Sequence, residues 1–339
     1  MSYKKKTDML KIFCYAMLSM AVVMSVYLLR LPRFSGIVPV IVTGVVIAFV
    51  AEILILMVLK GRNVLKRTIK IILLFVVNVS VFFGVIVYSF APAVILQPHS
   101  DEQSYEALQN VSQAEEITFE GANGKINGWF YNIAGERAPV VLYFYGNYET
   151  ASTRLLQLTQ NYTDSAFDGC NFAVFDYPAY GNSDGKCTDN TIQEFATDVY
   201  DELIKRTDNI IVLGYSVGTG PACYLAGNRE VRGLILYAPY NHSLDLYNNI
   251  IDVFHGPAEF LVSFRIDNTH NLKNNNAPVL ILASRNDELI PFSSSEYLYE
   301  NFSDLSVFVE VSGITHNQFL SDSFVRAETS DFIREVTAE

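Results

Sequence analysis

The stretch Asn209–Gly220, with the sequence NIIVLGYSVGTG, decides the fold of this chain. Residues 210–213 form a β-branched and aliphatic run, which is typical of a strand that is buried on both faces. The run ends in GYSVG, where Ser216 stands between two glycines, and a largely apolar segment follows from Pro221. The glycines permit a sharp turn from strand to helix, where a nucleophilic hydroxyl can sit with strained backbone torsions. An ordinary Gly/Ser turn is the alternative, but a strand before the turn and a helix after it favour a nucleophile at Ser216.

Strands and helices alternate on both sides of this stretch. Besides 210–213, we expect an antiparallel pair at 116–120 and 126–133, and strands at 139–145, 171–177, 234–237, 278–283 and 305–311. Helical segments are expected from about 150, at 192–204, after Ser216, at 294–300 and from about 319. This alternation predicts an α/β fold with a mostly parallel sheet and helices on both faces. The unusually long connection at about 239–277 predicts a small cap, and its apolar residues either pack on the sheet or line a pocket.

The first 95 residues differ from the rest of the chain. They contain three apolar runs, at about 12–29, 37–59 and 71–95, each long enough to cross the roughly 30 Å hydrocarbon core of a bilayer. We therefore predict a transmembrane region at 1–95, a polar tether at 96–113 and a globular domain at 114–339. The short segments before the first run and between the second and third are rich in Lys and Arg, which places the N-terminus in the cytoplasm and the globular domain outside it.

Charge is divided just as unevenly. Residues 1–95 hold eleven of the 24 Lys and Arg residues but only two of the 36 Asp and Glu residues, so the remainder carries a net charge of −21. An acidic domain of this kind repels the phosphates of nucleic acid, so we expect no nucleic-acid partner, and it would also be repelled by an anionic membrane surface. The sequence contains no metal-binding cluster and no phosphate-binding loop, so we expect no cofactor.

A serine nucleophile needs a base within hydrogen-bond reach and a carboxylate that orients the base. In an open parallel sheet these groups lie in loops at the carboxyl ends of strands. Of the five histidines, only His316 follows a predicted strand in a short loop before a helix; the others are His99, His242, His255 and His270. Asp287 follows the strand that ends at Ala283 and is our choice of acid, with Glu288 and Asp245 as competing choices.

Acyl transfer also needs hydrogen-bond donors that stabilise a developing oxyanion. The backbone N–H of Val217, directly after the nucleophile, is one expected donor. The second is expected in the turn after the strand PVVLYFY, at Asn147. A plain turn at Gly146-Asn147 is compatible with that role, because only the amide is required.

Taken together, the strand ends and loops that carry the candidate residues resemble those of α/β-hydrolases. YFYGNYETAS, from Tyr143, is similar to their His-Gly-Asn loop, and FDYPAYGNSDG, from Phe175, is similar to their Asp-Tyr-Arg-Gly-Tyr-Gly-x-Ser-x-Gly segment. DELIP at Asp287 and THN at Thr315 resemble their acid and histidine loops. The resemblance runs from about Glu116 to the C-terminus and is nearest to membrane-anchored serine hydrolases, which include depalmitoylating thioesterases and lysophospholipases. Tyr145 replaces the usual histidine of the first loop, and Pro178-Ala179 replaces Arg-Gly.

The resemblance implies an α/β-hydrolase fold with a small cap and a Ser216–His316–Asp287 acyl-enzyme mechanism. We therefore expect a membrane-anchored serine hydrolase that acts on carboxylic esters or thioesters, with the lipid bilayer and a lipid or lipidated substrate as partners. The order Ser216, Asp287, His316 matches the hydrolase order along the chain. A peptidase or aminopeptidase on the same fold and an inactive membrane receptor or scaffold remain alternatives. Neither the acyl chain nor the oligomeric state follows from the sequence.

Overall fold

The computed structural model describes residues 84, 87, 88, 91–160, 166–302 and 304–338 of the 339-residue chain. The chain divides into two compact units, Met1–Ala91 and Pro92–Glu339. The predicted membrane spans lie outside the described residues, apart from the end of the third. Within the described part, no helix is both long and apolar enough to cross a membrane.

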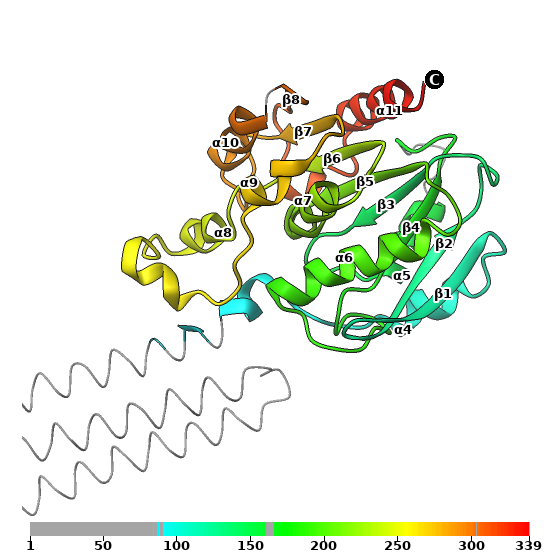
Figure 1. Ribbon diagram of the computed structural model, residues 1–339, viewed down its shortest axis with the longest axis horizontal. Coiled ribbons are helices and arrows are strands. Elements are labelled where there is room, and N and C mark those ends of the chain that lie inside the picture. Colours follow the sequence, from blue (N-terminus) through cyan, green and yellow to red (C-terminus); the bar gives the residue numbers. More distant parts are fainter. Residues whose placement is uncertain (1–83, 85–86, 89–90, 161–165, 303, 339) are drawn as a thin grey trace, which may run out of the picture. The chain divides into compact units, whose positions relative to one another are not determined.

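The second unit is built on one eight-stranded sheet (Figure 1). Its strands lie in the order β1-β2-β4-β3-β5-β6-β7-β8. Their bounds are β1 Ala114–Gly121, β2 Gly124–Tyr131, β3 Val140–Phe144, β4 Asn171–Phe175, β5 Ile210–Tyr215, β6 Gly233–Tyr237, β7 Val279–Ala283 and β8 Ser306–Glu310. The β1–β2 and β2–β4 pairs are antiparallel and all the other pairs are parallel. The mostly parallel sheet that the alternation predicted is therefore confirmed.

Helices cover both faces of this sheet. The main ones are α5 Ala151–Gln160, α6 Asp189–Leu203, α7 Thr219–Asn228, α10 Phe292–Phe302 and α11 Ser323–Thr337. Every residue of β3, β4, β5, β6 and β7 is buried, as expected where a parallel strand is covered on both sides. Because these strands are parallel, their carboxyl ends lie along one edge of the sheet, where the loops after β3, β5, β7 and β8 meet.

Residues 96–113, expected to be a polar tether, include a folded helix. This helix, α4 (Glu102–Leu108), is capped by Asp101, whose carboxylate accepts hydrogen bonds from the N–H and hydroxyl of Ser104 at 3.1 and 2.6 Å. Leu108 is fully buried, and Tyr105 packs against the ring of Trp129. The few apolar residues of the segment are thus sufficient to hold it against the sheet domain.

The insertion expected at about 239–277 lies between β6 and β7. It contains the helices α8 Ser243–Ile250 and α9 Asn268–Asn271 and the 3-10 turns η3 Gly256–Leu261 and η4 Leu272–Asn274. Figure 1 shows α8 in a lobe that stands out from the sheet. The lobe is partly packed, since Tyr247 and Phe264 are buried, and partly apolar on its outside.

Candidate active site

Ser216 occupies a sharp turn between β5 and α7. Its φ angle is +55°, in the left-handed region that residues other than glycine seldom adopt. The flanking glycines are required by close packing. A Cβ at Gly218 would lie 2.1 Å from the carbonyl oxygen of Phe144, and one at Gly214 would lie 2.7 Å from the Cβ of Ala222. The strand, the turn and the helix therefore approach so closely that only glycine fits on either side of the serine.

His316 and Asp287 reach Ser216 from the ends of two other strands. His316 follows β8, and its Nε2 lies 2.9 Å from Ser216 Oγ. Its Nδ1 lies 2.7 Å from Oδ2 of Asp287, which follows β7. The His316 and Asp287 side chains are almost entirely buried, so little water competes for either hydrogen bond. The three side chains chosen from the sequence are thus joined in one hydrogen-bonded line.

The loop after β7 presents Asp287 in one defined orientation. Asp287 Oδ1 accepts hydrogen bonds from the N–H groups of Leu289 and Ile290, both at 2.8 Å, which leaves Oδ2 to face the imidazole. Glu288, one competing acid, instead accepts a hydrogen bond from the backbone N–H of His316 at 3.1 Å.

Asp245, the other competing acid, belongs to the insertion. Its carboxylate accepts hydrogen bonds from the N–H of His242 and the hydroxyl of Ser294, at 3.1 and 2.5 Å, and helps to cap α8. Of the three carboxylates, only Asp287 is hydrogen-bonded to the imidazole of His316 in the described structure.

Tyr215 supports the histidine and was not foreseen from the sequence. Its ring stacks on the His316 ring with centroids 5.2 Å apart, and its hydroxyl donates a hydrogen bond of 2.7 Å to the His316 carbonyl. Burial raises the pKa of Tyr215 well above its usual range, so the phenol remains a donor. As the residue before the serine, Tyr215 could have been noted only as an aromatic side chain at the end of a strand.

The turn after β3 approaches Ser216 from the opposite side. A Cβ at Gly146 would lie 3.1 Å from the Tyr215 ring and 3.6 Å from the Ser216 Cβ, so glycine permits this close approach. The side chain of the next residue, Asn147, accepts a hydrogen bond from the N–H of Gln97 at 3.0 Å. Asn147 and Val217, the two residues expected to stabilise an oxyanion, line the same cavity as Ser216 and His316.

Tyr145, which stands where similar loops have histidine, lies in a buried polar cluster. Its hydroxyl accepts a hydrogen bond from the N–H of Tyr177 at 3.1 Å and lies 3.5 Å from the Asp176 carboxylate. Asp176 also accepts hydrogen bonds from the N–H groups of Ala151 and Asn182. Burial nevertheless dominates and raises the pKa of Asp176 to about 6. The cluster joins the turn after β3 to the loop after β4 and lies beneath the site.

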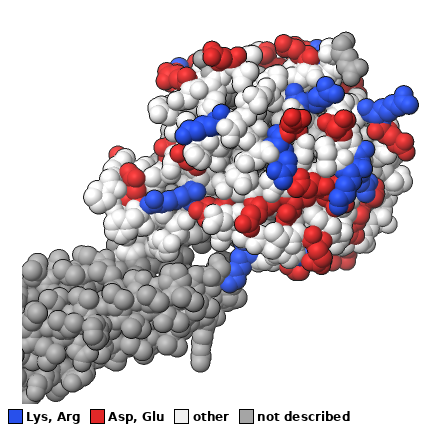
Figure 2. Space-filling view, viewed as in Figure 1, with Lys and Arg blue, Asp and Glu red and all other residues white. Residues whose placement is uncertain are grey.

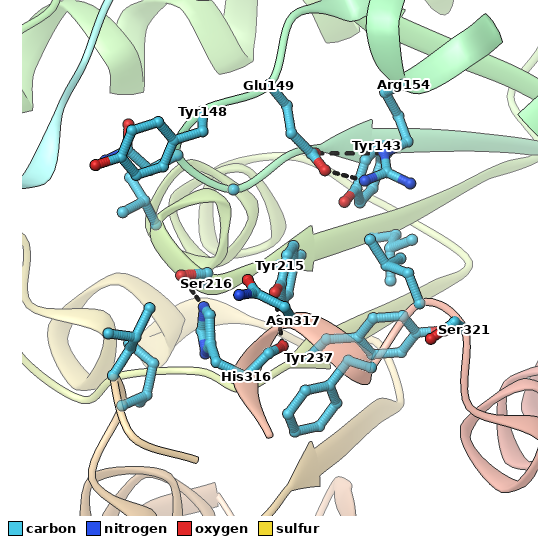
Figure 3. Close-up of a pocket in the computed structure, with 18 of the residues that line it drawn as sticks. Tyr143, Tyr148, Glu149, Arg154, Tyr215, Ser216, Tyr237, His316, Asn317 and Ser321 are labelled. Atoms are coloured by element: carbon cyan, nitrogen blue, oxygen red, sulfur yellow. Dashed lines mark hydrogen bonds and ion pairs between the residues drawn. The ribbon is translucent and has the colours of Figure 1, made fainter. Parts of the chain in front are cut away.

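A cavity of about 820 Å³ opens beside the serine. Figure 3 shows Ser216 and His316 on one side of it and the ion pair of Glu149 with Arg154 on the opposite side. Its wall is mostly apolar and includes Ile95, Leu158, Leu246, Phe319 and Leu320. A cavity of this size and character has room for an apolar chain next to the Ser216 hydroxyl.

The other four histidines are used elsewhere. His242 caps α8, His255 pairs with Asp252, His270 lies in α9, and Nδ1 of His99 is 3.0 Å from the carbonyl of Gln97. Within the part of the chain that the structure describes, no group of three His, Cys, Asp or Glu side chains could hold a metal ion.

Curated relatives are similar over part of the chain. A lysophosphatidylserine lipase, ABHD12 of Xenopus tropicalis, is 28% identical over 201 residues, which are 54% of this chain and 52% of the relative. Human alpha/beta hydrolase domain-containing protein 17B is 28% identical over 152 residues, covering 44% and 51% of the two chains. The chain thus spans about half the length of these relatives. No protein-family model matches it.

Solved structures are similar over most of this chain. An esterase of Pyrococcus furiosus, Pf2001, superposes with a TM-score of 0.56 at 16% identity, covering 71% of this chain and 98% of the esterase. An alpha-beta hydrolase of Vibrio vulnificus gives a TM-score of 0.56 at 20% identity, covering 75% and 92%. Together with the sheet order, these likenesses show that the chain has the α/β-hydrolase fold.

Proposed function

We propose that this protein is a serine hydrolase that cleaves a carboxylic ester or thioester through an acyl-enzyme. The observation that carries the proposal is the continuous line of hydrogen bonds from Ser216 Oγ through His316 to Asp287, at 2.9 and 2.7 Å. A general base must lie within hydrogen-bond reach of the hydroxyl oxygen whose proton it removes, about 2.6–3.2 Å between the heavy atoms, and His316 Nε2 meets that requirement at Ser216 Oγ. The contact with Asp287 is within the same range and orients the imidazole.

The reaction proceeds in two steps. His316 Nε2 takes the proton of Ser216 as Oγ forms a bond to the substrate carbonyl carbon. The backbone N–H groups of Val217 and Asn147 stabilise the oxyanion that forms. His316 then gives the proton to the leaving alcohol or thiol as its bond to carbon breaks. Water then attacks the acyl carbon as His316 takes one of its protons, and His316 gives that proton to Ser216 Oγ as the bond between Oγ and the acyl carbon breaks, which releases the carboxylic acid and restores Ser216. Throughout, Asp287 holds the imidazole with Nε2 toward the serine.

A lipid ester is the substrate class that we favour. The cavity wall beside Ser216 is mostly apolar, which suits an acyl chain, and the similar ABHD12 proteins are named lysophosphatidylserine lipases. We further propose that residues 1–95 anchor the protein in a membrane, with the N-terminus in the cytoplasm and the hydrolase domain outside. Alkaline phosphatase fused after Ile95 is then active, whereas an inactive fusion beside an active cytoplasmic reporter would reverse the orientation.

The proposed chemistry is tested by labelling membranes that contain the full chain with a fluorophosphonate probe. The wild type should be labelled and Ser216→Ala should not. Ser295→Ala is a matched control, because Ser295 is also a buried serine but donates its hydroxyl hydrogen bond to the Pro239 carbonyl. Labelling that persists in Ser216→Ala, or is absent from the wild type, contradicts the proposal. Rates on acyl p-nitrophenyl esters and on aminoacyl amides then separate an esterase from a peptidase.

A further inference from the structure

Exposed apolar side chains border the opening of the cavity. Val94, Tyr148, Ile250 and Leu289 all line the cavity, and each is about half exposed or more. They come from four separate segments: the start of the second unit, the turn after β3, the end of α8 and the loop after β7. Single exposed apolar residues are normal on a protein surface, but a group gathered around one opening marks a binding surface. We call these four residues the rim.

Two direct contacts join the segments of the rim in pairs. The side-chain amide of Asn249, beside Ile250, donates hydrogen bonds to the carbonyls of Glu288 and Leu289 at 2.9 and 3.1 Å. On the other side, the N–H of Gln97 donates to Asn147, next to Tyr148. The rim is therefore held together by the folded domain.

Three further apolar side chains, which follow Ile250 of the rim in the chain, are exposed on the lobe. Ile251, Val253 and Phe260 are 58%, 55% and 66% exposed, yet none of them lines the cavity. Figure 1 shows that the lobe stands out from the sheet, and the tip of the lobe is largely white, that is uncharged, in Figure 2. Together with the rim, these exposed apolar side chains mark a surface that an apolar partner would cover.

The position of the third predicted membrane span in the chain indicates which partner binds this apolar surface. The third predicted membrane span ends at Ile95, and Val94 and Ile95 are themselves part of the cavity wall. Directly after them, the N–H of Gln97 donates to Asn147 and to the Tyr180 hydroxyl, at 3.0 and 2.8 Å. Each residue of extended chain covers at most about 3.6 Å. A membrane-spanning segment that ends at Ile95 would therefore leave the bilayer surface close to the rim.

We propose that the rim and the apolar side of the lobe lie in the interfacial layer of a lipid bilayer. A lipid ester then enters the cavity from the bilayer without crossing water, a step that rests on the proposed function. The attraction is apolar, because the chain beyond residue 95 carries a net charge of −21 and an anionic surface repels it. Zwitterionic lipid is therefore the preferred surface, and added salt does not weaken the contact.

The test uses the full chain in phosphatidylcholine nanodiscs that hold one copy each and contain lipids brominated on their acyl chains. A fluorescent dye is attached through Ile251→Cys, in a Cys14→Ser, Cys187→Ser background, since Cys170 and Cys223 are buried. The control is Val307→Cys, whose position is 55% exposed, as against 58% for Ile251, but lies near the amino end of β8, away from the cavity. We expect the brominated lipids to quench the dye at position 251 and not at 307.

Activity provides a second measurement. The combined variant Ile251→Ser, Val253→Ser, Phe260→Ser should hydrolyse a long-chain ester in the bilayer at least about tenfold more slowly, because three buried apolar contacts with lipid are lost. Its rate on a soluble short-chain ester should equal that of the wild type, because none of the three residues lines the cavity.

Each remaining outcome overturns one specific claim. Equal quenching at positions 251 and 307 overturns the docking proposal. The docking proposal is also overturned if the dye at position 251 is shielded from water only in vesicles that hold many copies of the protein, because a second copy of the chain then covers the surface. A wild type that hydrolyses no ester contradicts the proposed function, while the quenching measurement still tests the docking by itself.

Discussion

Tyr145 and Tyr143 permit a comparison of two nearly identical changes. Both tyrosines are at most 1% exposed, and Tyr143 lies two residues earlier, within β3. The Tyr145 hydroxyl accepts a hydrogen bond from the Tyr177 N–H. The Tyr143 hydroxyl has no hydrogen-bond partner within the described part of the chain. Replacement by Phe removes one buried oxygen atom in each case but breaks a hydrogen bond in only one.

The expected free energies follow from what each change leaves unpaired. Tyr145→Phe leaves the buried N–H of Tyr177 without its acceptor, which costs about 1–3 kcal/mol of the free energy of unfolding. Tyr143→Phe leaves nothing unpaired and removes a buried hydroxyl that has no hydrogen-bond partner in the described part of the chain, so its effect lies between zero and a gain of about 1 kcal/mol.

The pH dependence of the Tyr145→Phe change has a definite sign. Burial raises the pKa of Asp176 from 3.8 to about 6, so this group makes the fold most stable below pH 3.8, and its contribution is lost as the pH rises through 6. The Tyr145 hydroxyl lowers the pKa of Asp176, because it favours the ionised carboxylate. Without the hydroxyl that pKa rises further, so Tyr145→Phe destabilises the protein more at pH 8 than at pH 5.

Urea unfolding of the full chain, followed by tryptophan fluorescence, measures these differences. Trp129 is the only tryptophan of the chain and is buried in β2, so its signal reports the unfolding of the hydrolase-fold unit. We expect the unfolding midpoint to fall for Tyr145→Phe and to be unchanged or higher for Tyr143→Phe. Equal losses in the two variants, or a larger loss for Tyr143→Phe, would refute the assignment of the hydrogen bond.

Two further substitutions, each with a matched control variant, test the geometry around Ser216. Asp287→Asn should lower kcat by about a hundredfold or more, because the imidazole loses its anionic partner. Glu288→Gln, whose amide oxygen can still accept the His316 N–H, should change kcat little; equal effects would refute the choice of acid. Gly218→Ala should prevent folding, since the new Cβ meets the Phe144 carbonyl at 2.1 Å. Gly135→Ala, at a φ of +89° but in open space, should cost only about 1 kcal/mol, and a well-folded Gly218→Ala protein on expression screening would contradict the packing argument.

The sequence by itself determined the eight strands in their order along the chain and the edge of the sheet at which the candidate catalytic residues gather. Runs of apolar residues identify buried strands whatever they pack against, and parallel strands necessarily bring their carboxyl ends to one edge. Ser216, Asp287 and His316 could therefore be chosen by their positions after strands. The pentapeptide around Ser216 also carried its local geometry, because the two glycines leave space where other residues would collide.

Only the tertiary structure decided which way each loop side chain points. Asp287 and Glu288 are neighbours, and no periodicity distinguishes them; hydrogen bonds from Leu289 and Ile290 turn one toward the imidazole. The roles of Tyr145 and Tyr215, and the packing of α4 where a tether was expected, likewise depend on contacts between residues far apart in the chain. Local sequence fixes a strand or a turn, but long-range packing fixes which polar groups lose water and must find a partner.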